Sequence, residues 1–455
     1  MLNALKSFAD RHLLFYSKNK IIVAVSGGLD SMVLLYLMSQ LDIEIVVAHC
    51  NFNLRATESD GDEAFVKKAV ADLKIDKIKL ETVSFDTTKY AEENKISIQE
   101  AARDLRYAWF ETIRKKHEAH WIATAHHLND NTETLLYNIS KGTGIKGLRG
   151  MLPKNGKIIR PMLEISRKEI AEFAEKNKIS YREDSSNSSL KYKRNFIRNK
   201  IVPELEQVNP NFEKTQRSHF QRFLDVELFY NEVIEKYKKD LFEKRNDDFF
   251  LSILKLQKVK GHQTLLFEIL NTYGFNFDQV TDILACLAVN ETKVFHAGNF
   301  RLLKTRKHLV LSDLSIEKQN YFELTEKTTK LELPNKEILQ IHIKPIDKLT
   351  KMSTKAHYAY LDKDLLQFPL VLRRWSDGDY FYPYGMYGQN GKAKKKKLKR
   401  YFADAKFSLL DKENTWLLTS GQKIVWIVNQ RIDDRFKVNE NTKNVFQVKF
   451  VECKK

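Results

Sequence analysis

Short apolar runs and helix-like patterns alternate over the first half of the chain. An apolar run at 21–25 ends at a pair of glycines, a helix-compatible pattern follows, and a second buried run is found at 43–48. Further strands are predicted at 79–83 and 121–124, and helices are predicted at 1–20, 58–73, 97–117 and 131–141. Strands that alternate with helices are typical of an α/β fold, so we expect a doubly wound parallel sheet.

The pattern changes near Pro210, where we expect a domain boundary. Residues 212–241 have the pattern of one or two long helices, and more helical pattern follows before a strand-like stretch at 292–311. A polar segment at 318–337 is interpreted as a linker, and short alternating runs beyond it predict strands. The expected organisation is an α/β domain over 1–208, a helical middle domain over 209–315 and a small β-rich C-terminal domain over 336–455.

The composition is that of a globular protein, because 42% of the 455 residues are hydrophobic and 30% are charged. This balance excludes collagen-like, mucin-like and generally disordered chains. Lys and Arg number 77 against 59 Asp and Glu, and the net charge of +18 favours a polyanionic partner such as a nucleic acid. A generally solubilising surface is the alternative, and clustering of the positive charge decides between the two.

The sequence contains no evident membrane, targeting or redox signal. No apolar run approaches the ~20 residues that cross a bilayer, and the N-terminus has no apolar core followed by a cleavage site. Cys50, Cys286 and Cys453 are too few and too widely spaced for a disulfide framework or a CxxC pair. We therefore expect a chain without a membrane segment, in the cytoplasm.

A glycine-rich loop carries the sharpest chemical signal, and it consists of Ser26, Gly27, Gly28, Leu29, Asp30 and Ser31. It lies between a predicted buried strand and a predicted helix, so its N–H groups and serine hydroxyls can converge on phosphate oxygens. The loop is neither a GxxxxGK[ST] nor a GxGxxG motif. Because a carboxylate repels a phosphate unless a cation lies between them, Asp30 indicates Mg²⁺. The alternative is an ordinary strand-to-helix turn capped by a serine or aspartate.

A second polar cluster at 125–134 directly follows the predicted strand at 121–124. In an open α/β sheet the carboxyl ends of the strands form the ligand-binding edge, so this cluster and the glycine loop can border one crevice. If the helix begins near Asp130, then Asp130 and Glu133 share one face and can hold a metal or an ammonium group. The alternative is that Asn129 or Asp130 caps the helix, with Glu133 completing a capping box and the two histidines as polar loop residues.

In this position the glycine loop resembles the pyrophosphate-binding loop of the N-type ATP pyrophosphatase (PP-loop, Rossmann-like) superfamily, whose members use ATP to adenylate a substrate oxygen. Several motifs in order resemble the tRNA(Ile)-lysidine synthase family over most of the chain. They are found at 26–31, 49–55, 99–107, 126–134, 142–144, 160–163, 183–187, 194–198, 373–379 and 425–434, with a Lys-rich run at 392–400.

The resemblance implies an enzyme that joins L-lysine to the wobble cytidine of a tRNA(Ile) with a CAU anticodon. ATP adenylates the cytidine ring oxygen with release of pyrophosphate, and the ε-amino group of lysine then displaces AMP to give lysidine. The implied cofactors are ATP and Mg²⁺, and the implied partners are this tRNA and free L-lysine, without a membrane. We also expect that the chain can form a homodimer.

The resemblance also implies roles for individual residues. Residues 26–31 would hold the ATP phosphates, with Asp30 and Asp130 at Mg²⁺ and with Asp130 and Glu133 handling lysine. Arg106 and Arg198 would lie near the reacting groups. The implied tRNA-binding residues are Lys191, Lys193, Arg194, Lys394, Lys395, Lys396, Lys397, Lys399 and Arg400.

Some residues depart from the family pattern or have a simpler interpretation. The family usually has Asp at position 129 and Gln at position 131, where this chain has Asn129 and Asn131. An amide lacks the charge of a carboxylate toward Mg²⁺, so Asn129 is a weak ligand candidate. Arg106 on its helix can equally be solvated or paired with a nearby acid, and the lysines at 394–397 can equally form a solvated loop.

The sequence fits three other function classes less well. A tRNA sulfur transferase with the same loop usually needs paired cysteines, which the sequence lacks. An amide-forming relative with a glutaminase needs an N-terminal Cys or an added domain, and the chain starts with Met1. A non-catalytic tRNA-binding relative would not need Asp30, Asp130 and Glu133, all of which are present.

Overall fold

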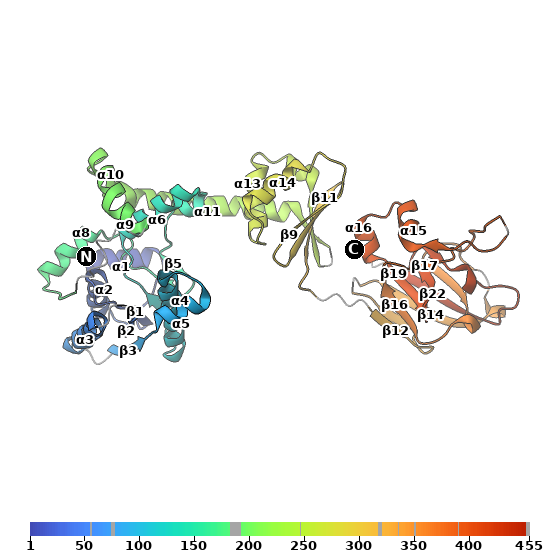
Figure 1. The fold of residues 1–455 in the computed structure, drawn as a ribbon, viewed down its shortest axis with the longest axis horizontal. Helices are drawn as coiled ribbons and strands as arrows, with labels where there is room; N and C mark the ends of the chain where they lie inside the picture. The colour runs from blue at the N-terminus through green and yellow to red at the C-terminus, as the bar shows by residue number, and fades with distance from the viewer. Residues whose placement is uncertain are drawn as a thin grey trace. The chain divides into compact units, whose positions relative to one another are not determined.

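The computed structural model describes residues 1–54, 57–73, 78–182, 193–245, 247–316, 321–334, 336–349, 352–389 and 391–451. The chain divides into two compact units, Met1–Lys236 and Tyr237–Lys455, and each is described by itself (Figure 1). The motif at 183–187 and the predicted tRNA-binding residue Lys191 lie outside the described residues.

The first unit alternates strands and helices, as the apolar pattern predicts. Its strands are β1 (Lys20–Ala24), β2 (Glu44–Asn51), β3 (Ile78–Ser84), β4 (Trp121–Ala123), β5 (Lys154–Asn155) and β6 (Ile158–Ile159). Its helices are α1 (Leu2–Arg11), α2 (Leu29–Ser39), α3 (Thr57–Asp72), α4 (Thr87–Asn94), α5 (Ile98–Lys116), α6 (Leu128–Lys141), α7 (Ile145–Leu148), α8 (Arg167–Lys176), α9 (Lys193–Phe196), the π-helix η2 (Ile197–Ile201), α10 (Val202–Val208) and α11 (Phe212–Leu241), which continues into the second unit.

Within the described part of the first unit, the strands form a sheet in the order β3-β2-β1-β4-β6-β5. All neighbours are parallel except β5, which pairs antiparallel with β6. The strand β1 is central, since Ile21 pairs with Ile45 on one side and with Trp121 on the other. The doubly wound parallel sheet is therefore confirmed, and the loops after β1, β4 and β6 emerge at the same edge.

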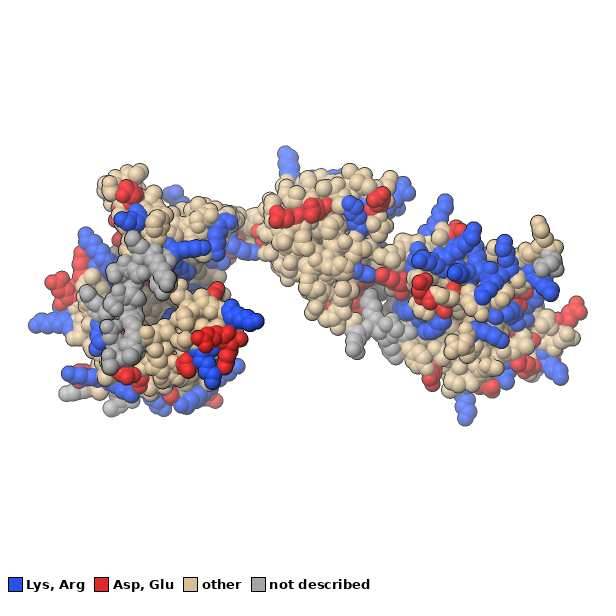
Figure 2. Space-filling view, viewed as in Figure 1, with Lys and Arg blue, Asp and Glu red and all other residues tan. Residues whose placement is uncertain are grey.

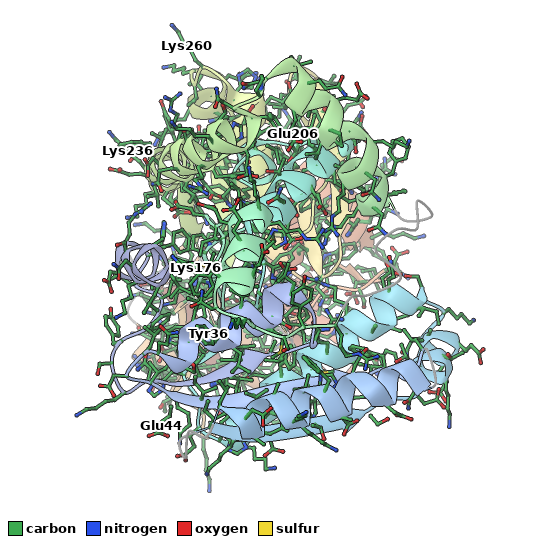
Figure 3. The ribbon with its side chains drawn as sticks, turned by 90° about the vertical axis from the view of Figure 1, so that its left-hand side faces the viewer. Tyr36, Glu44, Lys176, Glu206, Lys236 and Lys260 are labelled. Carbon is green, nitrogen blue, oxygen red and sulfur yellow. The ribbon has the colours of Figure 1, made fainter. Side chains whose placement is uncertain are left out.

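Helices cover both faces of this sheet. One face packs against α1, α2, α3 and α8 through a core that includes Val23, Val33 and Ile170. The opposite face packs against α5 through Ile22 and Phe110. The side view in Figure 3 labels Tyr36 on α2 and Lys176 on α8, two helices that pack against each other. Because both faces are covered, the strands read as continuous apolar runs.

Two element boundaries differ from the sequence prediction. The first helix ends at Arg11 and not near residue 20, because Leu13 has a positive φ of 49° and starts a turn. The helix α6 begins at Leu128, earlier than predicted, because the N-cap residue is His127, a residue type outside the usual capping set. The long pattern at 212–241 forms one helix.

The second unit adds antiparallel sheets to a short helical region. Its strands are β7 (Phe242–Arg245), β8 (Asp248–Ser252), β9 (Lys293–Ala297), β10 (Phe300–Lys304), β11 (His308–Asp313), β12 (Tyr321–Leu324), β13 (Lys330–Glu332), β14 (Ile338–Pro345), β15 (Tyr358–Asp362), β16 (Leu370–Arg374), β17 (Tyr380–Phe381), β18 (Lys396–Lys397), β19 (Trp416–Ser420), β20 (Lys423–Ile427), β21 (Arg431–Ile432) and β22 (Asn444–Val451). Its helices are α12 (Ile253–Gln257), α13 (His262–Asn271), α14 (Phe277–Ala285), α15 (Leu398–Asp404), α16 (Leu409–Asn414) and the short 3₁₀ turns η3 (Ile346–Lys348), η4 (Lys363–Leu365) and η5 (Asp434–Phe436).

The second unit covers most of the expected middle segment and the whole of the expected C-terminal segment, and the expected bounds of these domains stay predictions. Helices α12, α13 and α14 are joined by a sheet in the order β7-β8-β11-β10-β9, of which the sequence pattern predicted only the 292–311 part. The β-rich C-terminal segment has sheets in the orders β12-β16-β19-β20-β21 and β13-β14-β22-β15 around a core containing Trp426 and Phe446. The interpretation of 318–337 as a linker is wrong, because it contains β12 and β13. In the described ranges no helix is long and apolar enough to cross a membrane.

Candidate active site

The glycine loop is a tight turn after β1 that is closed by hydrogen bonds to Ser31. The backbone N–H groups of Ser26 and Gly27 both donate to the Ser31 hydroxyl, at 3.1 and 3.2 Å. Gly27 has φ +93°, a conformation that favours glycine, and Gly28 is the N-cap of α2. The first turn of α2 leaves N–H groups without intrahelical partners at this point, and the sequence prediction of an anion-binding loop fits this geometry.

A buried histidine contacts the residue that precedes the loop. His49 is 2% exposed, and its Nδ1 lies 2.9 Å from the carbonyl oxygen of Val25, the residue before the loop. Burial lowers the pKa of His49, so the neutral ring donates Nδ1–H to that carbonyl. This contact holds the backbone of Val25, directly before the loop, in place.

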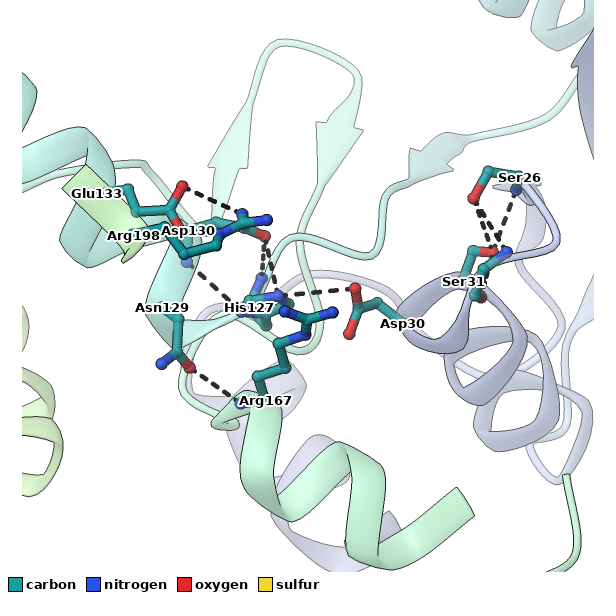
Figure 4. A network of polar contacts seen from close by, with 10 residues as sticks. Ser26, Asp30, Ser31, His127, Asn129, Asp130, Glu133, Arg167 and Arg198 are labelled. Atoms are coloured by element: carbon teal, nitrogen blue, oxygen red, sulfur yellow. Dashed lines mark hydrogen bonds and ion pairs between the residues drawn. The ribbon is translucent and has the colours of Figure 1, made fainter. Parts of the chain in front are cut away.

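An acidic cluster lies on α6 at the same edge of the sheet. The Arg198 side chain, from η2, donates to both carboxylate oxygens of Glu133 at 2.6 and 3.1 Å, and to Asp130 at 3.3 Å. Two side chains three residues apart on one helix therefore share one guanidinium, as the i, i+3 spacing permits (Figure 4). Since η2 is a π-helix, its irregular turn aims Arg198 at α6.

Asp30 completes the cluster from the glycine loop. The His127 Nε2 lies 3.7 Å from Asp30 Oδ2 and 3.5 Å from Asp130 Oδ2, so the imidazole sits between the two carboxylates (Figure 4). The Nδ1 of the same ring accepts the Asp130 backbone N–H at 3.4 Å. With Nδ1 accepting this N–H, the other ring nitrogen, Nε2, faces both acids.

The environments of the three acids differ. Burial raises the pKa of Asp30, and burial also raises the pKa of Glu133 against the opposing charge of Arg198. Burial acts upward on Asp130 as well, but the nearby imidazoles of His127 and His126, the His127 backbone N–H that Asp130 accepts and the charge of Arg198 outweigh burial and hold the pKa of Asp130 below its ordinary value. Neighbouring acids whose pKa values are pushed in different directions are typical of a reactive site.

A divalent cation fits this arrangement. Asp30 Oδ1 is buried and has no hydrogen-bond donor, whereas its other oxygen faces His127. In the described ranges no group of three His, Cys, Asp or Glu side chains could hold a metal ion by itself. Because Mg²⁺ usually keeps water and binds through one or two carboxylates plus phosphate oxygens, the carboxylates of Asp30 and Asp130 would suit its coordination.

The two asparagines that depart from the family pattern have structural roles. Asn129 Oδ1 accepts the backbone N–H of Arg167, at the start of α8, at 2.9 Å. Asn131 is 2% exposed and its Oδ1 accepts the backbone N–H of Met151 at 2.6 Å. The alternative in which Asn129 or Asp130 caps α6 with Glu133 is wrong, because the capping box joins His127 and Asp130.

A cavity of about 870 Å³ joins the loop to the acids. Its lining includes Asp30, Asp130, Arg106 and Arg194, together with the rings of Phe52 and Tyr107. The Arg106 guanidinium stacks over Phe52, with its central carbon 5.1 Å from the ring centre. Among the residues that the structure describes, Arg106 forms no ion pair with an acid, and the cavity has room for a nucleotide.

The structure brings most of the predicted site residues together. The cavity lining includes Ser26, Gly28, Leu29, Asp30, Ser31 and Asp130, and Arg198 joins Asp130 to Glu133 (Figure 4). Leu29 is the first residue of α2. Sequence reasoning missed His127, whose position directly before an apolar helix start was the available signal. Lys193 and Arg194 lie on α9, and Arg194 lines the cavity.

Family profiles match three parts of the chain: a PP-loop domain over residues 2–205, a TilS substrate binding domain over 244–314 and a TilS substrate C-terminal domain over 370–449. A tRNA(Ile)-lysidine synthase of Parabacteroides distasonis is 38% identical over 99% of this chain and 100% of its own length. Proteins of the same name from Bacteroides thetaiotaomicron and Porphyromonas gingivalis are 35% and 36% identical, over 98% and 95% of this chain and 98% and 94% of theirs. The chain belongs to the tRNA(Ile)-lysidine synthase family.

Membership of the tRNA(Ile)-lysidine synthase family confirms the resemblance seen in the sequence. The match to the PP-loop domain makes the chain an ATP-using enzyme. Burial raises the pKa of the Cys50 thiol to about 12, so it remains protonated at neutral pH. In the part of the chain that the structure describes, Cys50 and Cys286 form no disulfide.

The C-terminal segment of this chain carries many Lys and Arg side chains close together on its surface (Figure 2). The Lys-rich run does not form a solvated loop throughout, because Lys396 and Lys397 form β18 and α15 begins at Leu398. Lys396 pairs with Asp404 at 2.7 Å, and the Lys395 ammonium lies 3.7 Å from the centre of the Tyr380 ring. The exposed cations of the run are Lys392, Lys394, Lys395, Lys397, Lys399 and Arg400.

Proposed function

We propose that this chain attaches L-lysine to the wobble cytidine of a tRNA(Ile) with a CAU anticodon, forming lysidine and releasing AMP and pyrophosphate. The observation that carries the proposal is the Arg198-bridged pair Asp130 and Glu133, facing Asp30 across His127 beside the glycine loop. The full-length relatives named tRNA(Ile)-lysidine synthase support the choice of substrates.

The first step transfers an adenylyl group. The N–H groups and hydroxyls of residues 26–31 bind the β- and γ-phosphates of ATP, and the cytidine ring oxygen attacks the α-phosphorus. The bond between the α- and β-phosphates breaks, and pyrophosphate leaves. Asp30 and Asp130 would hold Mg²⁺, which when bound would supply positive charge to offset the negative charge that develops on the leaving group.

The second step forms the carbon–nitrogen bond. Asp130 and Glu133 hold the ε-ammonium group of lysine and accept a proton from it, and the resulting amine attacks the carbon that carries the adenylated oxygen. The carbon–oxygen bond breaks and AMP leaves. Glu133 suits proton transfer because burial raises its pKa, while Arg198 keeps its carboxylate oriented.

The deciding experiment measures incorporation of labelled lysine into a tRNA(Ile) transcript with the CAU anticodon, in the presence of ATP and Mg²⁺. We expect one lysine per tRNA, and no incorporation into the same transcript with uridine at the wobble position. Pyrophosphate release without attached lysine would contradict the named reaction and leave only an adenylating PP-loop enzyme. Retention of sulfur from a sulfide donor would instead favour a sulfur transferase.

The positive surface of the C-terminal segment is proposed to bind tRNA phosphates. Replacing Lys394, Lys395 and Lys397 by alanine should weaken tRNA binding by at least ~10-fold and flatten the plot of log affinity against log salt, because each lost phosphate contact removes about 0.7 to 0.9 from the slope. Filter binding at several salt concentrations measures both. A matched control changes the same net charge at the exposed residues Lys327, Lys330 and Lys336. Equal slopes of log affinity against log salt in the two variants would show that the Lys-rich run does not bind tRNA phosphates.

Two further parts belong to the same proposal. We place the reaction in the cytoplasm, because free thiols such as Cys50 are stable there.

We also propose that the protein is a homodimer. Sedimentation equilibrium tests this directly, because a monomeric mass at micromolar concentration contradicts it.

A further inference from the structure

Arg160 occupies a position at the ligand-binding edge that the proposed reaction does not use. It directly follows β6, the parallel neighbour of β4, and Thr124 N donates to the carbonyl oxygen of Ile159 at 3.0 Å. The chain after β4 carries His126 into the cavity. The chain after β6 thus brings Arg160 next to the cavity wall formed by His126, at the edge where open α/β sheets bind ligands.

The guanidinium of Arg160 is buried and incompletely bonded. Its residue is 7% exposed, Nη1 donates to the carbonyl oxygen of Leu152 at 2.7 Å, and Nε is buried without an acceptor. A guanidinium has five N–H donors in a planar fork, so one bond to a carbonyl leaves most of its capacity unused. Other half-buried arginines of this unit bind carboxylates, as Arg114 does with Glu111.

The electrostatic surroundings of Arg160 are also unusual. In the described ranges no carboxylate pairs with it. After burial, the groups that act on its pKa are Tyr107, which raises it, and the charges of Arg103 and Arg149, which repel the guanidinium and lower it. Because Arg149 forms an ion pair with Glu227, the positive charge near Arg160 that has no such partner among the described residues is that of Arg103. Burial lowers the pKa of Arg160. A buried cation without an anionic partner is costly, and an anionic ligand would offset that cost.

We propose that Arg160, together with Arg103 and Arg194, binds a backbone phosphate of the RNA next to the nucleotide that is modified. This inference rests on the proposed function and assigns a binding role to residues outside the acidic cluster. The three arginines come from different elements, namely α5, the end of β6 and α9, and they surround the wall that carries His126 and Tyr107.

Three observations favour an RNA phosphate over the other anions of the reaction. The ATP phosphates already have the glycine loop, which lies with Asp30 at the acidic side of the cavity. Arg103 and Arg194 are exposed, so the positive charge continues from the buried guanidinium to the surface, as a bound strand requires and a free amino acid does not. The Arg103 guanidinium also stacks over the Tyr107 ring at 4.9 Å, which places an aromatic face beside the proposed phosphate for an unstacked base.

The experiment combines variants of Arg160 with tRNA(Ile) in which one phosphate at a time is replaced by an uncharged methylphosphonate, at each linkage of the anticodon loop. Binding is measured by filter retention with the full chain, without ATP or lysine. For the unaltered protein we expect one linkage near the wobble nucleotide to cost ~10-fold in affinity, the size of a lost charged hydrogen bond. Arg160→Met should lose a similar factor on unmodified tRNA and show no further loss at that linkage. Arg160→Lys, which keeps the charge without the fork, should lie between the two.

The controls separate this role from a purely structural one. Arg114→Met removes an arginine that also donates to a backbone carbonyl, that of Ala119, but that is held by Glu111, and it should leave every linkage effect unchanged. Circular dichroism checks folding, and if Arg160→Met does not fold, Arg160→Lys is compared with the unaltered protein at the same linkages. An identical linkage profile in every folded Arg160 variant would overturn the proposal and leave Arg160 as an anchor for Leu152. A variant that raises only the KM for lysine would also overturn it, in favour of the lysine carboxylate. Because the binding assay contains no ATP or lysine, failure of lysine transfer alone would contradict the proposed function and not this one.

Discussion

The Asp30→Asn variant is expected to lose ATP-dependent pyrophosphate release by about 10²- to 10³-fold and, without nucleotide or Mg²⁺, to unfold at a higher temperature than the unaltered protein at pH 7. The loss follows because an amide has no charge with which to hold the cation beside the phosphates. The gain in stability follows from the buried Oδ1, which has no donor in the folded chain. Pyrophosphate release and thermal unfolding measure the two effects separately.

The sign of the stability change can be followed through pH. Burial raises the pKa of Asp30 in the folded chain above its unfolded value, so folding favours the protonated form. The stabilising protonated state is fully present below the unfolded pKa and is lost as the pH rises through the folded pKa. The advantage of Asp30→Asn should therefore be largest at neutral pH and disappear near pH 4.

A matched variant tests whether the effect is local. Asp10 is an exposed carboxylate on α1, and Asp10→Asn should change neither pyrophosphate release nor the unfolding temperature. If Asp30→Asn retains near-normal turnover, Asp30 does not hold the cation. If it loses turnover but also loses stability at pH 7, its ionised carboxylate is stabilised by contacts other than a bound cation.

The positions of the loop and of the sheet were predictable because they depend on local patterns. A β-branched run such as 21–25 is buried on both faces in a parallel sheet and therefore lacks polar alternation. The glycine loop follows it directly, and the positive φ of Gly27 is the conformation that a glycine in such a turn indicates. The approach of Asp130 to Asp30 also followed from sheet topology, since both lie after parallel strands.

Other features depend on contacts that no local pattern encodes. The imidazole of His127 caps α6, a role that capping rules give to short polar side chains, so the predicted helix start was late. Arg198 reaches Glu133 across 65 residues of sequence through an irregular π-helical turn. In the sequence Arg160 is only the first residue of the motif at 160–163. Its burial and its single hydrogen bond to a carbonyl, which show that the guanidinium has unused donors, are seen only in the structure.

The Arg198→Met variant is expected to lose lysine attachment by at least ~10²-fold and to be destabilised by about 3 kcal/mol, the cost of breaking a buried ion pair from one side. Glu133 is 2% exposed, and its two oxygens are held by the Nε and Nη2 of Arg198. Without the guanidinium, Glu133 keeps a buried charge with no compensating cation, and its carboxylate loses its orientation toward Asp130. Urea denaturation measures the stability, and labelled lysine measures attachment.

A second substitution separates the fold from the chemistry at this pair. Arg198→Met combined with Glu133→Gln removes both charges, so most of the lost stability should return, while lysine attachment should remain absent. The pH dependence has a defined sign: burial raises the pKa of Glu133, so the single variant Arg198→Met should be least stable above that pKa and approach the double variant as the pH falls and Glu133 takes up a proton. Arg198→Lys restores a charge without the two-pronged contact and should recover stability more than activity. If the double variant regains lysine attachment together with stability, the pair only supports the fold, and the ammonium group of lysine must be held elsewhere in the cavity.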